Sequence, residues 1–199
     1  MNIQFKDKRL NLLYNATIDP LLFLLMVGFG HALWHILFPS LTLESTEVWL
    51  FDRYDITPFT NRIQAIMAHQ HYLIAHALYP ETVQRGLTVF IPNHIGSYMA
   101  WGCVGAKQAM IFVLSIVFSR GKHLHKLWFI PCGVVVLHFV NLARITLLFY
   151  FSSFKLEYFD LMHDHVLKIF YYFIIFLIWL LWQYQFNPEY NSAFRKKTK

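Results

Sequence analysis

Long apolar stretches separated by short polar connections dominate the chain. Four of them approach the roughly 20 residues that a helix needs to cross the hydrocarbon core of a bilayer. They are residues 18–38, 104–118, 127–151 and 166–184. Their apolar positions are not confined to one helical face, which argues against surface helices and favours insertion. The pattern therefore predicts an all-α membrane protein, a helical bundle with about four transmembrane helices.

The distribution of charge between these stretches predicts their orientation. Short cytoplasmic connections are enriched in Lys and Arg. Basic residues cluster in three places: residues 6–9, residues 120–126 and residues 195–199. Acidic residues concentrate in the connections 39–101 and 152–165. We therefore expect both termini in the cytoplasm and the two acidic connections outside.

Two weaker patterns lie within the long outer connection. Residues 62–79 combine apolar positions at helical spacing with many polar ones, which predicts an extracytoplasmic amphipathic helix, with a further span as the alternative. Residues 86–101 have the character of a short extended segment, and Pro92 restricts it to an edge or a bulge. An incoming substrate strand could pair with this segment.

Composition supports the membrane assignment and excludes one function class. Of the 199 residues, 57% are hydrophobic, 19% are aromatic and only 14% are charged, which differs from an ordinary soluble domain. The net charge of +6 does not predict a nucleic-acid partner, because the basic residues stand at the ends of apolar runs. No repeat or linker divides the chain, so we expect a single integral-membrane domain over residues 1–199, located in a bacterial cytoplasmic (inner) membrane.

Arg144 is the most informative single residue. It lies inside the apolar run 128–151, and a cation at the centre of a membrane helix costs about 2.5 kcal/mol or more. Such residues usually face a polar cavity and are functional. The alternative is that its long side chain extends to the interface. Lys107 and Lys168 also have two alternatives: their side chains extend to the interface, or they contact a functional site.

Three reactive side chains reach one face of the membrane in the predicted topology. Cys103 precedes the second span, Arg144 lies about 10 Å below the outer end of the third, and His163 and His165 stand at the outer entrance of the fourth. A cysteine near a helix N-terminus is favoured as thiolate, an imidazole transfers protons near neutrality, and a guanidinium stabilises an oxyanion. The trio predicts covalent acyl transfer with an outward-facing site and no metal or cofactor.

The segments around these residues resemble a known family. Gly102-Cys103-Val104-Gly105, then Asn141-Leu142-Ala143-Arg144, then His163 are similar to the Cys-Ser-Gly, Asn-x-x-Arg and late His segments of the exosortase and archaeosortase family of membrane cysteine transpeptidases. The resemblance covers about residues 85–182. Val104 replaces the usual serine, and His165 competes with His163, which fits the family spacing better.

The resemblance implies catalytic Cys103, Arg144 and His163. The implied substrates are secreted proteins held in the membrane by a C-terminal sorting signal, which consists of a short motif, an apolar helix and a basic tail. Cleavage would proceed through a thioester, and water, a membrane lipid or a glycan amine would then release or anchor the product.

Two other function classes remain open at the level of sequence. Eleven histidines, among them His31 and His35 at i, i+4 spacing and His69, His71 and His76, allow a metal-dependent membrane hydrolase or oxidase. A His-Glu-x-x-His motif is absent from the sequence. A non-catalytic scaffold explains the spans but not the predicted convergence of Cys103, Arg144 and His163.

Overall fold

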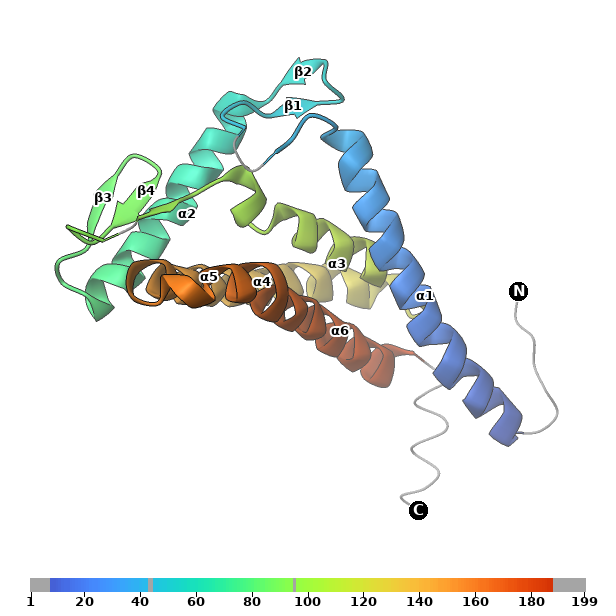
Figure 1. Ribbon diagram of the computed structural model, residues 1–199. Helices are drawn as coiled ribbons and strands as arrows, with labels where there is room; N and C mark the ends of the chain where they lie inside the picture. Colours follow the sequence, from blue (N-terminus) through green and yellow to red (C-terminus); the bar gives the residue numbers. More distant parts are fainter. Residues whose placement is uncertain (1–7, 43–44, 95, 188–199) are drawn as a thin grey trace.

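The computed structural model describes residues 8–42, 45–94 and 96–187, and it is mostly helical (Figure 1). The long helices are α1 (Lys8–Leu37), α2 (Thr57–Leu78), α3 (Ala106–Phe118), α4 (His123–Phe154) and α6 (Leu167–Phe186). The strands are β1 (Trp49–Leu50), β2 (Tyr54–Asp55), β3 (Val83–Arg85), β4 (Thr88–Phe90) and β5 (Ser97–Tyr98). Short helical turns are η1 (Trp101–Cys103), η2 (Leu156–Tyr158), α5 (Phe159–Leu161) and η3 (Met162–Val166).

Among the described residues, three helices are long and apolar enough to cross a membrane: Ile18–Leu37 within α1, then α4, then α6. Large apolar side chains on these helices are exposed, as lipid contact requires; examples are Leu24, Phe139 and Ile169. The predicted helical fold is therefore confirmed. Helix α3 has 13 residues and is about 20 Å long, so the predicted fourth span stays a prediction.

The helix and the extended segment that were predicted for the long connection between α1 and α3 are present, with shifted boundaries. The helix is α2, which begins at Thr57 with Pro58 in its first turn, where a missing N–H costs nothing, and its extracytoplasmic, amphipathic character stays a prediction. The extended segment is a three-stranded antiparallel sheet in the order β3-β4-β5, whose first strand precedes the predicted range. Pro92 follows β4 and lies outside the strand pairing, consistent with its missing N–H.

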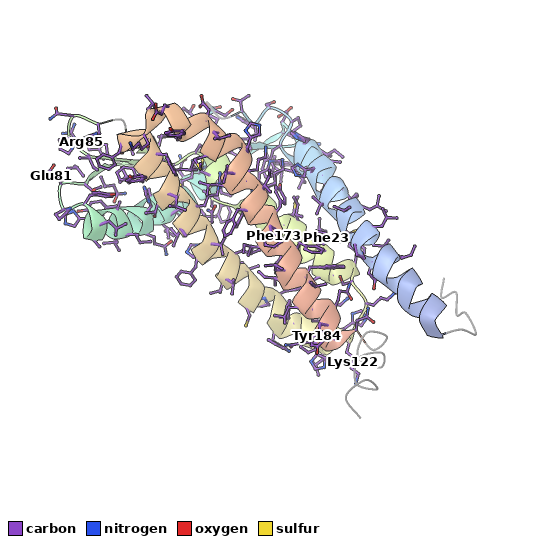
Figure 2. All side chains as sticks on the ribbon, turned by 60° about the horizontal axis from the view of Figure 1, so that its bottom comes forward. Phe23, Glu81, Arg85, Lys122, Phe173 and Tyr184 are labelled. Atoms are coloured by element: carbon purple, nitrogen blue, oxygen red, sulfur yellow. The ribbon has the colours of Figure 1, made fainter. Side chains whose placement is uncertain are left out.

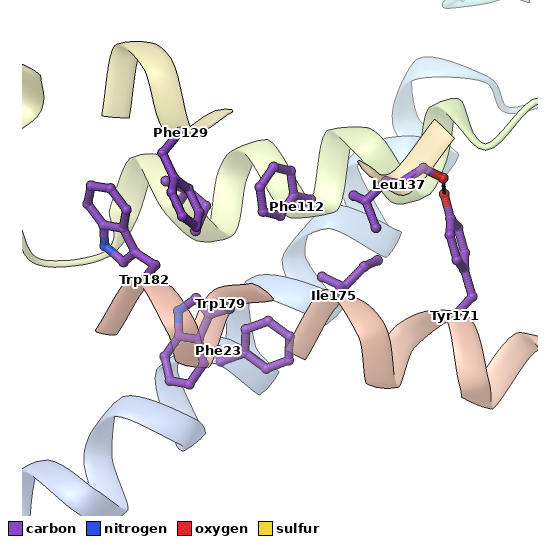
Figure 3. Close-up of a cluster of buried hydrophobic side chains, with 9 residues drawn as sticks. Phe23, Phe112, Phe129, Leu137, Tyr171, Ile175, Trp179 and Trp182 are labelled. Carbon is purple, nitrogen blue, oxygen red and sulfur yellow. Dashed lines mark hydrogen bonds between the residues drawn. The ribbon is translucent and has the colours of Figure 1, made fainter. Parts of the chain in front are cut away.

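The main core lies where α1, α3, α4 and α6 meet (Figure 3). Phe23 of α1 packs against Trp179 of α6 with ring centroids 4.9 Å apart. The Trp179 indole N–H donates to the Ser119 hydroxyl at 2.9 Å, and that of Trp182 donates to the Arg120 carbonyl at 3.0 Å. Because both polar indole atoms find partners in the α3–α4 connection, α6 is held against that connection.

The two ends of the bundle carry different polar and charged residues. Figure 2 shows Lys122 and Tyr184 at one end of the α4–α6 pair and Glu81 and Arg85 at the other. Lys126, one of the basic residues used for the topology prediction, is buried and donates to the carbonyls of Val117 and Ser119 at 2.7 Å each. Its positive charge therefore also stabilises the C-terminus of α3.

Close packing of α3 on α4 generates a stability prediction. A Cβ at Gly133 of α4 would overlap the ring of Phe112, which is fully buried, whereas a Cβ at Gly28 of α1 would meet open space. We expect Gly133→Ala to lower the free energy of unfolding by about 1–3 kcal/mol through overpacking. Gly28→Ala is the matched control and leaves the free energy unchanged or raises it. Thermal unfolding in detergent measures both, and equal melting temperatures would contradict this packing.

Candidate active site

Cys103 lies in the η1 turn between β5 and α3. Its N–H donates to the Ala100 carbonyl at 2.9 Å. Gly105 follows with a φ of 85° and forms the N-cap of α3, a left-handed conformation that glycine adopts without strain. A Cβ at Gly105 would meet the Asn141 side chain at 3.1 Å and the Tyr171 hydroxyl at 3.3 Å. Glycine at this position therefore lets the cysteine turn approach α4 and α6 closely.

Asn141 connects the cysteine turn to Arg144. Its side chain is fully buried, and its Nδ2 donates to the Cys103 carbonyl at 2.8 Å. Its Oδ1 accepts a hydrogen bond from Nη1 of Arg144 at 3.2 Å, one helical turn further along α4. The two sequence segments that carry the predicted cysteine and arginine are thus joined by a continuous chain of hydrogen bonds. The prediction assigned no role to Asn141, although a buried amide three residues before an intramembrane arginine is a usable signal.

The charge of Arg144 acts on the Cys103 thiol. Burial raises the pKa of the thiol above its ordinary value, and the Arg144 charge and the hydrogen bond at Ala100 partly oppose this. The expectation that a helix N-terminus favours thiolate here is therefore wrong, because Cys103 precedes α3 and is largely desolvated. Nε of Arg144 is buried and has no hydrogen-bond partner in the described part of the chain.

Apolar side chains from two helices surround the half-buried cysteine. Cys103 packs with Met67 and Ala68 of α2 and with Leu142 and Ile145 of α4. Water is therefore largely excluded from the thiol. Electrostatic interactions in such a site are stronger than in bulk solvent.

His163 lies in the η3 turn that leads into α6. Its ring is half-buried and stacks on Phe159 with centroids 5.6 Å apart. The Tyr171 hydroxyl donates to the Leu137 carbonyl at 3.1 Å, so Leu137 of α4 and Tyr171 of α6 lie at the same height along the bundle. Measured along the helices from this height, Arg144 lies about 10 Å and His163 about 12 Å toward the same end of the bundle. His165 lies in the same turn and is exposed.

A second histidine, His71 of α2, is fully buried near the cysteine cluster. It lies one turn beyond Met67 and Ala68, and its ring packs edge-on against Phe149. Nδ1 is 3.5 Å from the Thr146 hydroxyl, which is long for a hydrogen bond, and Nε2 is buried without a partner among the described residues. Burial lowers the pKa of His71 to about 4. Sequence patterns did not distinguish His71 from the neighbouring histidines His69 and His76.

The structure offers no support for a metal centre. Among residues 8–42, 45–94 and 96–187, no three His, Cys, Asp or Glu side chains come together as metal ligands would.

Comparison with known proteins finds no matching family model, no matching curated protein and no matching solved structure.

Arg144→Gln tests the electrostatic contact with the thiol. Without the guanidinium the thiol pKa rises further, so we expect alkylation of Cys103 near pH 8 to slow about three- to tenfold. The measurement uses a Cys132→Ser background, so that the signal comes from Cys103, and a full pH profile separates pKa from access. Lys155→Gln, at an exposed cation, is the control and leaves the rate unchanged. An unshifted profile for Arg144→Gln would show that the guanidinium does not act on the thiol.

Because His71 is buried, we expect the free energy of unfolding to fall in acid. The folded state keeps His71 neutral down to a pKa of about 4, whereas the unfolded chain binds a proton near pH 6.5. The free energy of unfolding therefore falls between about pH 6.5 and 4, by up to about 3 kcal/mol from this group. Denaturant unfolding at several pH values should show that His71→Gln removes this part of the decline. His69→Gln, on the exposed face of the same helix, should retain it, and identical pH profiles would contradict the assignment.

Proposed function

We propose that the protein is an exosortase-like cysteine transpeptidase that cleaves the C-terminal sorting signal of membrane-anchored secreted proteins. The observation that carries the proposal is the hydrogen-bond chain from the Cys103 carbonyl through Asn141 to Arg144. It unites two motifs of the resemblance that lie 38 residues apart in the sequence. Apolar packing around the thiol limits the access of water, which would slow unproductive hydrolysis of a thioester.

Each residue has a defined role in the proposed reaction. The Cys103 sulfur attacks the carbonyl carbon of the scissile peptide bond after an imidazole removes its proton. Arg144 donates N–H groups to the oxyanion of the tetrahedral intermediate. The intermediate collapses to a thioester, and the imidazolium gives its proton to the leaving amine. His163 is the proposed base, and its level along the bundle near Arg144 supports this role.

The proposed substrate follows from the resemblance and the membrane fold. A sorting signal with an apolar helix would lie beside the bundle, and its peptide bond just outside that helix would reach Cys103. The charge distribution supports an outward-facing site and cytoplasmic termini, and the proposed location is a bacterial inner membrane. Water, a lipid or a glycan amine would accept the acyl group.

Trapping of a thioester tests the proposal. The full chain is co-expressed with secreted proteins of the same genome that end in an apolar helix and a basic tail. We expect mass spectrometry to detect a substrate fragment on Cys103 that hydroxylamine releases. Cys103→Ala should abolish processing at unchanged membrane insertion. Arg144→Ala should lower kcat by about 100-fold or more, as loss of an oxyanion donor does.

Matched variants separate the alternatives. Cys132→Ala, at the exposed second cysteine, should leave processing intact. His163→Ala, His165→Ala and His71→Ala identify the base, because only the base should change the acid limb of the pH profile. Processing that survives Cys103→Ala and is lost with a chelator would replace the proposal with a metal-dependent enzyme. Correct insertion with no processing of any candidate would favour a scaffold.

A further inference from the structure

A group of basic side chains lies where α1, α3 and α6 meet. We call it the basic cluster, and it consists of His31, His35, Lys107 and Lys168, with the Tyr172 hydroxyl beside them. The charges of Lys107 and Lys168 act on each other and on His31, which also feels His35. These side chains come from three different helices and are not used in the proposed reaction.

Hydrogen bonding and packing define the position of the basic cluster. Nε2 of His31 is 2.8 Å from the Tyr172 hydroxyl, which joins α1 to α6. The same two helices meet again at Phe23 and Trp179. Phe23 precedes His31 in α1 whereas Trp179 follows Tyr172 in α6, so the two helices run in opposite directions. One turn from the first contact, His35 on α1 and Lys168 on α6 therefore lie at a common level.

Helix α3 brings Lys107 to the same level. Gly30 of α1 lies so close to Ile111 of α3 that a Cβ there would be 2.6 Å from the isoleucine side chain. Lys107 is one turn from Ile111, at the beginning of α3. The partial positive charge of the α3 N-terminus adds to that of the cluster.

No described carboxylate neutralises the positive charge of the basic cluster. In the part of the chain that the structure describes, neither Lys107 nor Lys168 forms an ion pair with an Asp or Glu side chain. Two ammonium groups that repel each other beside apolar helices are costly. An anion with several oxygens would remove this repulsion and accept hydrogen bonds from both lysines.

We propose that the basic cluster binds the phosphate of a membrane phospholipid. A lipid, instead of a free phosphate, fits because large exposed apolar side chains flank the cations. Ile36 on α1 is 60% exposed, and Ile169 and Phe173 on α6 are 68% and 52% exposed. The acyl chains would lie on this surface while the phosphate contacts Lys107 and Lys168. The site does not depend on the chemistry of Cys103.

Native mass spectrometry of the full chain in detergent tests the proposal. The probes are dioleoyl phosphatidylglycerol and dioleoylglycerol, which differ in the phosphate-bearing headgroup. We expect the wild type to retain one phosphatidylglycerol with an affinity at least about tenfold higher than that for dioleoylglycerol. Lys107→Gln with Lys168→Gln should remove this preference. Lys155→Gln and Cys103→Ala should bind as the wild type does, which separates this site from the proposed reaction.

Three results would overturn the proposal. The first is equal affinity for the two lipids, and the second is unchanged binding in the double variant. The third is displacement of phosphatidylglycerol by millimolar inorganic phosphate that itself binds, which would assign the site to a soluble anion. If the double variant does not fold, Lys168→Gln alone, at an exposed residue, should weaken phosphatidylglycerol binding by about threefold or more.

Discussion

The Asn141 amide is the interaction on which the arrangement around Cys103 depends. It is buried between apolar helices, where an unsatisfied amide costs about 1–3 kcal/mol. Both of its ends are used, one by the Cys103 carbonyl and one by Arg144. The amide therefore ties a turn that begins outside the long helices to a guanidinium inside one of them. Without it, Arg144 would have no described protein acceptor for its Nη1, and the turn would have one fewer anchor on α4.

Small residues allow these polar contacts to form. Gly105 brings the cysteine turn against Asn141 and Tyr171, and Gly133 and Gly30 let α3 approach α4 and α1. Packing of small residues is a main source of helix association in membranes, where the hydrophobic effect between helices is weak. Helix α3 is short, yet it contacts α1, α4 and α6. It therefore holds the remaining helices at distances that side-chain hydrogen bonds can span.

Hydropathy predicted the long helices well because a span must satisfy its backbone internally and expose apolar side chains to lipid. Arg144 was found for the same reason, since a cation inside such a run needs an explanation.

Contacts between distant segments were not predictable in this way. The packing of Cys103 against Met67 and Ala68 joins two segments that share no pattern. That packing, with its desolvation, is why the thiol pKa is raised when local helix geometry predicted the opposite. The burial of His71 was missed because three histidines on one helix look alike until their faces are known. The fourth span, the orientation and the catalytic role of His163 stay predictions.

Arg144 also relates the cysteine site to the basic cluster. Its charge acts on Cys103 and on the hydroxyls of Tyr171 and Tyr172, and Tyr172 contacts His31. Among the described residues, no carboxylate pairs with Arg144, Lys107 or Lys168. A bundle that needed only to be stable would gain from replacing such cations with apolar residues. The proposed reaction and the proposed lipid site would each account for such cations, because an oxyanion would face Arg144 and a phosphate would face Lys107 and Lys168.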